Sequence, residues 1–260
     1  GAGDTFVVVG DSHAAAMRPA FETLPALHGM RGELWWRGEC ALLAGVRTVP
    51  DADAEECSAF KNSALSEIER RGDVRIVILA GRWPSYLLGT NPEQGGSYRT
   101  HLASDTGNLP PTSEGSVTLF ETSLADTVQR IVASGKRVVL MGTVPEPGFD
   151  VPVMTALAAK NGAAAATTLP LAEVQERNRG VDRILGDIAA RFSDVHYVRV
   201  WDSFCNGTSC SLQWNGMPAY SDDDHVSYGF AREGLGKIVA ERWPDSNGEE
   251  GRTVGAPVAR

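Results

Sequence analysis

Short, mostly apolar runs recur along the chain and predict the strands of a buried sheet. Runs of this length without polar alternation are typical of strands that are covered on both faces of a parallel sheet. The expected strands are Phe6–Val9, Glu33–Arg37, Val74–Gly81, Arg137–Gly142 and Val195–Val200.

Amphipathic stretches lie between these runs and predict helices, because their apolar residues recur at helical spacing. The expected helices are Ala14–Leu24, Asn62–Arg71, Leu119–Ser134, Val181–Phe192 and Val226–Trp243. Strands that alternate with helices favour an α/β fold in which a parallel sheet is covered on both faces. In such sheets the functional groups gather at the carboxyl ends of the strands.

One long segment breaks this alternation. Leu88–Gly115 is rich in Gly, Pro, Ser and Thr, and we expect it to be a loop. Loops of this length are usually functional or mobile. We therefore hypothesise that the segment forms a lid or an acceptor groove.

Composition limits the number of domains and the kinds of partner. The 260 residues, 42% of them hydrophobic, suffice for one sizeable core. We assign residues 1–245 to a single domain and the polar residues 246–260 to a disordered tail. The net charge of -9 disfavours a phosphate-binding surface, so nucleic acid is not an expected partner. No apolar run approaches the roughly 20 residues of a membrane span.

The four cysteines fall into two local groups, Cys40 with Cys57 and Cys205 with Cys210. Neither group has the spacing of a zinc site, and no histidine lies near either in sequence, so we expect no metal. Two local disulfides are the preferred interpretation, although three pairings are formally open. Disulfides indicate an oxidising compartment. Reduced core cysteines in a cytosolic protein are the alternative.

A serine at the end of the first strand is the candidate nucleophile. Ser12 follows the apolar run at the edge where a parallel sheet collects its functional groups. A serine hydroxyl needs a nearby base, and that base needs a carboxylate to fix its tautomer. Asp222 and His225, just before the last helix, can supply both. Taken separately, these motifs are typical of a helix cap and of a solvated acidic loop.

Together the motifs carry a resemblance. The stretch "VVVGDSHA" opens the chain and "YSDDDHVSYGFA" precedes its last helix, while "VILAGRWPSY" and "GTVPEPGFDVP" follow central strands. This set resembles the SGNH, or GDSL-like, hydrolase superfamily over about Phe6 to Trp243. Within it, the set is most similar to the SGNH domains of OafA-like acyltransferase-3 membrane proteins. The two cysteine groups stand where those domains carry cysteine pairs. The resemblance implies a three-layer α/β/α, flavodoxin-like fold.

The resemblance also assigns roles to residues. It makes Ser12 the nucleophile, His225 the general base and Asp222 the orienting acid, with Asp223 and Asp224 as loop acids. An oxyanion needs hydrogen-bond donors, and the N–H of Ser12 is one candidate.

The chain lacks the asparagine that usually follows the central strand and donates to the oxyanion. The candidates to replace it or to complete the oxyanion hole are Gly81, Arg82, Gly38 and Gly45. A salt bridge is the alternative for Arg82. His13 is expected to be local scaffold or a substrate contact. Trp83, which we favour as a core residue, and Tyr86 are open between the core and a sugar-stacking surface.

The resemblance implies an extracytoplasmic O-acyltransferase domain, most simply an O-acetyltransferase, tethered to a membrane domain. An acyltransferase-3 membrane module outside this sequence would supply the acyl group, and a cell-surface or secreted glycan would accept it. No cofactor is expected. An esterase that acts on carbohydrate or lipid esters is the first alternative, because water could replace the glycan. A non-catalytic glycan-binding module is the second.

Overall fold

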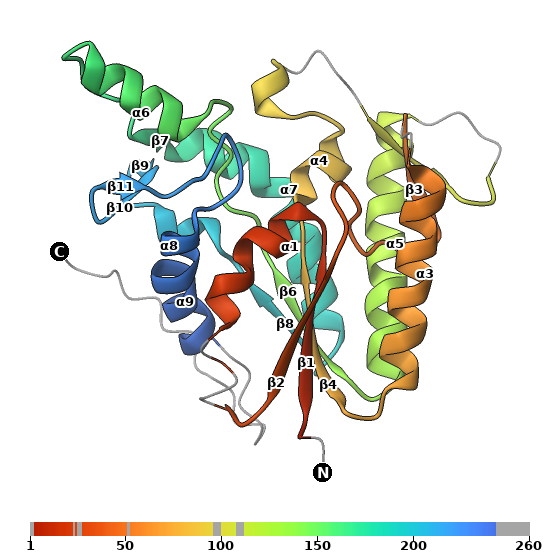
Figure 1. Ribbon diagram of the computed structural model, residues 1–260. Coiled ribbons are helices and arrows are strands. Elements are labelled where there is room, and N and C mark those ends of the chain that lie inside the picture. The colour runs from red at the N-terminus through yellow and green to blue at the C-terminus, as the bar shows by residue number, and fades with distance from the viewer. Residues whose placement is uncertain are drawn as a thin grey trace.

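A five-stranded parallel sheet in the order β2-β1-β4-β6-β8 forms the centre of the computed structural model (Figure 1). The structure describes residues 3–22, 24, 28–50, 53–95, 100–107 and 112–242. All neighbouring strands pair in parallel, so their carboxyl ends share one edge, at the top of Figure 1. This sheet confirms the five predicted strands. They are β1 (Thr5–Gly10), β2 (Arg31–Trp36), β4 (Val74–Ala80), β6 (Arg137–Met141) and β8 (Val195–Val198).

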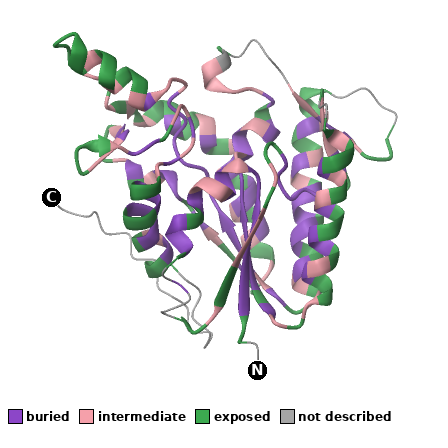
Figure 2. Cartoon of the chain, viewed as in Figure 1, coloured by how far each residue is buried: buried purple, intermediate pink, exposed green. Residues whose placement is uncertain are grey.

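Helices cover both faces of the sheet, and strand alternation decides which residues face each layer. Val7 and Val9 of β1 pack toward α3 (Ala54–Arg70), α5 (Ser113–Ala133) and much of α7 (Leu171–Arg191). Phe6 and Val8 face the opposite layer. That layer contains α1 (Ser12–Met17), η1 (Arg18–Phe21), α8 (Tyr228–Phe230), η4 (Ala231–Leu235) and α9 (Gly236–Glu241). The buried residues accordingly concentrate along the strands and the inner helix faces (Figure 2). The expected α/β/α arrangement is confirmed.

Several helix boundaries differ from the sequence prediction. The first helix is split into α1 and the 3-10 turn η1, because Pro19 has no N–H to continue an α-helix. The last helix begins only at Tyr228 and includes a π-helical stretch, η4. A further helix, α6 (Val151–Lys160), was not predicted. It has exposed apolar side chains and therefore lacks the one-sided pattern of a packed helix.

The predicted loop Leu88–Gly115 is partly regular structure, which corrects that expectation. It contains the turn η2 (Pro92–Gln94) and the strand β5 (His101–Ser104), and α5 begins within it at Ser113. The strand β5 pairs antiparallel with β3 (Val46–Val49) beside the main sheet. Residues 96–99 and 108–111 lie outside the described part of the chain. The lid or groove therefore stays a hypothesis.

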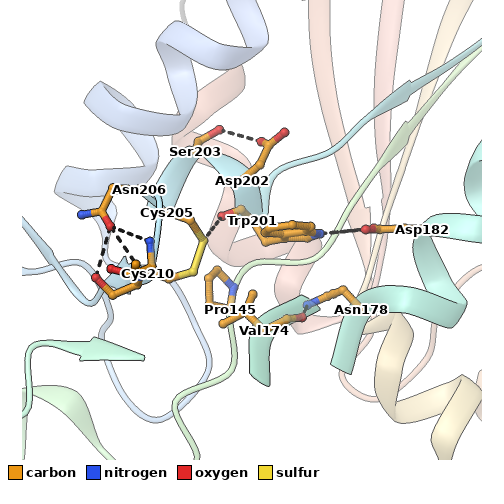
Figure 3. The surroundings of a disulfide bond; sticks show 12 residues. Pro145, Val174, Asn178, Asp182, Trp201, Asp202, Ser203, Cys205, Asn206 and Cys210 are labelled. Carbon is orange, nitrogen blue, oxygen red and sulfur yellow. Dashed lines mark hydrogen bonds between the residues drawn. A yellow bond between two sulfur atoms is a disulfide. The ribbon is translucent and has the colours of Figure 1, made fainter. Parts of the chain in front are cut away.

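Both predicted disulfides are present, Cys40–Cys57 and Cys205–Cys210, and they leave no free cysteine. The reduced-thiol alternative is therefore wrong. The second bridge joins the end of η3 (Trp201–Phe204) to β9 (Ser209–Ser211) (Figure 3). Beside it, the indole N–H of Trp201 donates to Asp182 of α7.

Small antiparallel pairs complete the architecture. One joins β7 (Thr168–Pro170) to β9, and the other joins β10 (Gln213–Trp214) to β11 (Met217–Pro218). Residues 243–260 lie outside the described part of the chain, so the boundary at residue 245 and the tail at 246–260 stay predictions. Among the described residues, none of the helices has the length and apolarity needed to cross a membrane.

Candidate active site

The end of β1 is built so that Ser12 begins α1. Gly10 closes the strand where β4 lies very near, and a Cβ at this position would come within 1.7 Å of the Ala80 carbonyl oxygen. Only glycine allows this approach. Ser12 is then the first residue of α1, at the carboxyl edge of the sheet, as the sequence predicted.

Asp11 fixes this turn by using both carboxylate oxygens. Its Oδ1 accepts the N–H of His13 at 2.8 Å and so caps α1. Its Oδ2 accepts the N–H of Arg82 and the hydroxyl of Tyr86, each at 2.9 Å. Asp11 therefore ties the end of β1 to α4 (Trp83–Leu88), which begins just after β4. Burial and the neighbouring Asp11 raise the pKa of Tyr86, so this phenol stays a donor.

A short acidic loop brings His225 to Ser12. Within it, Asp222 Oδ1 accepts the N–H groups of Asp224 and His225 at 3.0 and 2.7 Å. The N–H of Ser221 donates to the carbonyl of His225 at 2.8 Å and closes the loop. The buried Tyr220 hydroxyl anchors it by donating to the carbonyl of Pro145 at 2.8 Å.

His225 lies within hydrogen-bond distance of Ser12 and of Asp222, the two residues proposed with it from sequence as a catalytic triad. His225 Nε2 is 2.8 Å from Ser12 Oγ, although the two residues are 213 positions apart. His225 Nδ1 is 2.9 Å from Asp222 Oδ2. All three side chains are half-buried, so Ser12 is accessible to a substrate. A nucleophile, a base and an orienting acid in this order can perform acyl transfer through a serine ester.

Asp224 differs from the sequence expectation, which treated it as a loop acid. Its carboxylate is buried, with a side chain 6% exposed against 38% for Asp222. Asp224 Oδ1 lies 2.7 Å from His225 Nδ1. Asp224 Oδ2 contacts the Arg82 guanidinium and lies 3.4 Å from His13 Nε2. Asp223, in contrast, is half-buried, and its burial raises the pKa of its carboxyl.

These contacts set the protonation of the site. Contact with Asp224 raises the pKa of His225 to about 9, against the opposing effect of burial, and the charge of Asp222 adds to this rise. Burial alone would raise the pKa of Asp224. Contact with His13 and His225 and the charge of Arg82 outweigh that effect and hold the Asp224 pKa well below its ordinary value. The site therefore pairs an ionised Asp224 with an imidazolium at neutral pH.

Arg82 makes salt bridges, which was the alternative to its role as an oxyanion donor. It donates to Glu93 at 3.1 and 2.8 Å and also contacts Glu146 and Asp224. The carboxylate of Glu146, only 1% exposed, also accepts from Arg177 Nε at 2.6 Å. The negative charges of Glu146, Glu93 and Asp224 outweigh burial and raise the pKa of Arg82. Sequence reasoning missed Glu93 and Glu146 as partners of Arg82, and Arg177 as the second cation on Glu146.

The other candidate oxyanion donors are glycines in different settings. Gly81 lies between Asp11 and Ala41, where a Cβ would be 3.1 Å from Asp11 Oδ2. Gly38 is exposed, with open space around it. Gly45 has a φ of 71° and accepts the N–H of Asp105 on its carbonyl, next to β3. An assignment of the oxyanion donors stays a prediction.

The aromatic residues near the site divide into buried and exposed groups. Trp83 is fully buried, and its indole N–H donates to the Met141 carbonyl at 2.7 Å, so the favoured core interpretation is confirmed. Tyr86 is buried as well, which argues against a sugar-stacking surface at either residue. Among the described aromatic residues, only Trp36 and Tyr228 are largely exposed, at 51% and 52%.

Among the described residues, two clusters at the site have the ligand types of a metal centre, and both include Asp224; one of them consists of Asp222, Asp223 and Asp224. His13, Asp224 and His225 offer atoms that lie within 4.8 Å of one another. However, the Arg82 guanidinium already contacts Asp224, and a fixed positive charge at this carboxylate opposes a second cation. Both ring nitrogens of His225 also face protein partners. The donor set therefore fits acid–base chemistry better than metal binding.

Comparison with known proteins shows which family the chain belongs to. A match to curated proteins was not found. The periplasmic domain of the lipopolysaccharide acetyltransferase of Salmonella ser. Paratyphi A has a similar structure, with a TM-score of 0.65, 15% identity and coverage of 93% of this chain and 84% of that one. At this identity the likeness shows the fold.

Other solved structures also match. TesA gives a TM-score of 0.49 at 15% identity, covering 92% of this chain and 97% of that one. The catalytic domain of Streptococcus pneumoniae peptidoglycan O-acetyltransferase A gives a TM-score of 0.40 at 12% identity, covering 93% of each chain. The family described as "SGNH domain (fused to AT3 domains)" matches residues 1–234. The chain therefore belongs to the family of SGNH domains that are fused to AT3 domains.

Proposed function

We propose that this chain is an extracytoplasmic O-acetyltransferase domain that passes an acetyl group through an ester on Ser12 to a hydroxyl of a glycan. The observation that carries the proposal is the 2.8 Å distance between His225 Nε2 and Ser12 Oγ, with carboxylates behind Nδ1 of the same ring. Membership of a family fused to AT3 domains supports transfer as the reaction.

The reaction has two matched steps. In the first, His225 Nε2 takes the proton of Ser12 while Oγ attacks the acetyl carbonyl, and the tetrahedral intermediate collapses as His225 returns the proton to the leaving group. In the second, His225 takes the proton of an acceptor hydroxyl, whose oxygen attacks the serine ester. Collapse then breaks the bond to Oγ and returns the proton to Ser12. The proton count is unchanged over the cycle.

The charge state of His225 sets a condition on these steps. A base must be neutral, and a pKa of about 9 leaves only a small neutral fraction at pH 7. The same carboxylates stabilise the imidazolium that forms in each step. The two carboxylates thus lower the fraction of His225 that is neutral, but they stabilise its imidazolium form during each step.

A sugar acceptor is supported by the positions of the exposed aromatic residues. Trp36 ends β2 and pairs in register with Gly10, two residues before Ser12. Tyr228 stands three residues after His225, and its hydroxyl donates to Glu22 at 3.1 Å. Exposed indole and phenol rings offer apolar faces with polar edges, which suit the faces of sugar rings. We propose that the acceptor glycan binds across this edge of the sheet.

The acyl donor and the location follow from the family and the cysteines. We propose that the fused membrane module presents the acyl group to Ser12 on the extracytoplasmic side. Two disulfides support an oxidising compartment, and the family description names the AT3 fusion.

The discharge of acetylated enzyme tests transfer against hydrolysis. The protein would be loaded with an activated acetyl ester, and the loss of the acetyl mass would be followed with and without soluble glycans. Transfer predicts faster loss with a glycan and acetyl appearing on that glycan. Loss at one rate in all cases would establish an esterase. Saturable glycan binding without turnover, unchanged in Ser12→Ala, would establish a binding module.

A further inference from the structure

Two carboxylates share one nitrogen of His225. Asp222 Oδ2 lies 2.9 Å and Asp224 Oδ1 lies 2.7 Å from Nδ1. A neutral ring that accepts the Ser12 proton on Nε2 carries a single N–H at Nδ1, which faces both acids. One N–H cannot point straight at both acids, so the surroundings of each acid decide how much it contributes.

Their surroundings separate these roles. Asp222 already accepts two backbone N–H groups through Oδ1, so it shapes the loop that presents His225. Its side chain is 38% exposed, so the high dielectric constant of water weakens the interaction of its charge with the ring. The side chain of Asp224 is 6% exposed, so its charge acts on the ring through a medium of lower dielectric constant.

A second group also fixes the position of the Asp224 carboxylate. The Arg82 guanidinium contacts its Oδ2, and Arg82 is fixed in turn by Glu93 and Glu146. Arg177 of α7 is the last member of this ion-pair network, and it donates to Glu146 at 2.6 Å. A carboxylate with this support keeps its position better than a half-exposed one.

We propose that Asp224 is a positioning residue, and that it is the main electrostatic partner of the His225 imidazolium, while Asp222 chiefly shapes the loop and orients the ring. No bond forms or breaks at Asp224. This inference rests on the proposed function and names a further residue of that same site.

The groups that face His225 come from three elements. Ser12 and His13 face it from α1, and the rings of His13 and His225 lie 4.8 Å apart between centroids. Asp222 and Asp224 face it from its own loop, and Arg82 acts through Asp224 from the start of α4. Removal of the Asp224 charge leaves Asp222 as the only carboxylate in contact with His225 among the described residues. Consistent with this picture, the pKa of His225 is raised more by Asp224 than by Asp222.

The test compares Asp224→Asn, Asp222→Asn and Asp223→Asn as matched variants. For each, the rate of Ser12 acetylation by an activated ester would be measured against pH. We expect Asp224→Asn to lower the midpoint of the rising limb by roughly one pKa unit or more, since a charge in contact commonly shifts a pKa by that amount. Asp222→Asn should shift the midpoint less, and Asp223→Asn should leave it unchanged. A larger shift for Asp222→Asn than for Asp224→Asn would overturn the inference.

A second measurement does not depend on the folding of the Asp224 variant or on activity. The imidazole of His225 would be titrated by NMR in the wild type and in Asp222→Asn, whose amide oxygen can still accept the loop N–H groups. The inference predicts that the pKa of His225 stays well above 6.5 in Asp222→Asn. A fall to about 6.5, the ordinary value for histidine, would overturn it. If the wild type forms no acetyl-enzyme, the proposed function fails, but this titration still decides the inference.

Discussion

Asp224 Oδ1 lies 2.7 Å from His225 Nδ1, and the second oxygen of the same carboxylate contacts Arg82. This single side chain therefore connects His225, the proposed general base, to a buried ion-pair network. The network continues through Glu146 to Arg177 on α7. The loop that carries His225 is thus fixed to the segments that follow β4 and β6. Asp11 ties the turn before Ser12 to the first of these segments.

The first prediction concerns pH. The raised pKa of His225, about 9, means that the neutral base is scarce below that value. We expect the rate of Ser12 acetylation by a neutral activated ester to rise with pH through a midpoint near 9. A series of single-turnover rates across this range, corrected for spontaneous ester hydrolysis, measures it. A plateau that is already reached near pH 7 would contradict the assigned contacts.

The second prediction concerns the acceptor. Trp36→Ala removes the exposed indole at the end of β2, in register with Gly10. Burial of such a ring against a sugar contributes on the order of 2 kcal/mol. We expect the glycan concentration for half-maximal discharge to rise about 10-fold or more, with acetylation by a small ester unchanged. Val117→Ala on α5, also an exposed apolar residue, serves as the control. An unchanged glycan dependence in Trp36→Ala would exclude this acceptor site.

Much of the fold could be predicted because its signals are local. The strands β1, β4 and β6 contain the unbroken apolar runs Phe6–Val9, Ile76–Ala80 and Val138–Met141. Such runs indicate burial without any knowledge of their neighbours. The helix α6 gave no such signal, since Val153, Met154 and Leu157 remain exposed. Pro19 marks in the sequence the point where α1 cannot continue, whereas the helix predicted over Ala14–Leu24 extends beyond it.

Of the candidate site, only the residues that belong to its two polar sequence motifs could be predicted. Ser12, Asp222 and His225 belong to two short stretches whose chemistry is recognisable only when both are considered together. The network around Arg82 was not, because Glu146 and Asp224 are 64 and 142 positions away from it and an acid's burial depends on the folded chain. In the sequence, Asp224 is one of three adjacent aspartates, and nothing local distinguishes the buried one.

The third prediction tests the network. Glu146→Gln leaves Arg82 and Arg177 without the charge that both contact, and breaking a buried ion pair costs about 3–5 kcal/mol. We expect a loss of this size in the free energy of unfolding, measured with urea. Glu176→Gln breaks the exposed pair with Arg179 and should cost within about 1 kcal/mol. Equal losses in the two variants would argue against a structural role for Glu146.

The fourth prediction ranks the disulfides. Cys40–Cys57 spans 17 positions and Cys205–Cys210 spans 5. A longer closed loop restricts the unfolded chain more, so we expect the first bridge to contribute about 3 kcal/mol and the second about 2 kcal/mol. Urea unfolding of the two paired Cys→Ala variants checks this order. A greater loss of unfolding free energy in the variant without Cys205 and Cys210 would show that loop closure is not the main source of the stabilisation.

The central claim is that Ser12 carries the acyl group, and intact mass spectrometry tests it most directly. Wild type, Ser12→Ala and His225→Gln would be mixed with an activated acetyl ester above pH 9, where His225 is largely neutral. We predict one acetyl mass on the wild type, mapped to Ser12, with none on Ser12→Ala and a strongly reduced yield on His225→Gln. An equal acetyl mass on wild type and Ser12→Ala, or none on either, would contradict the claim.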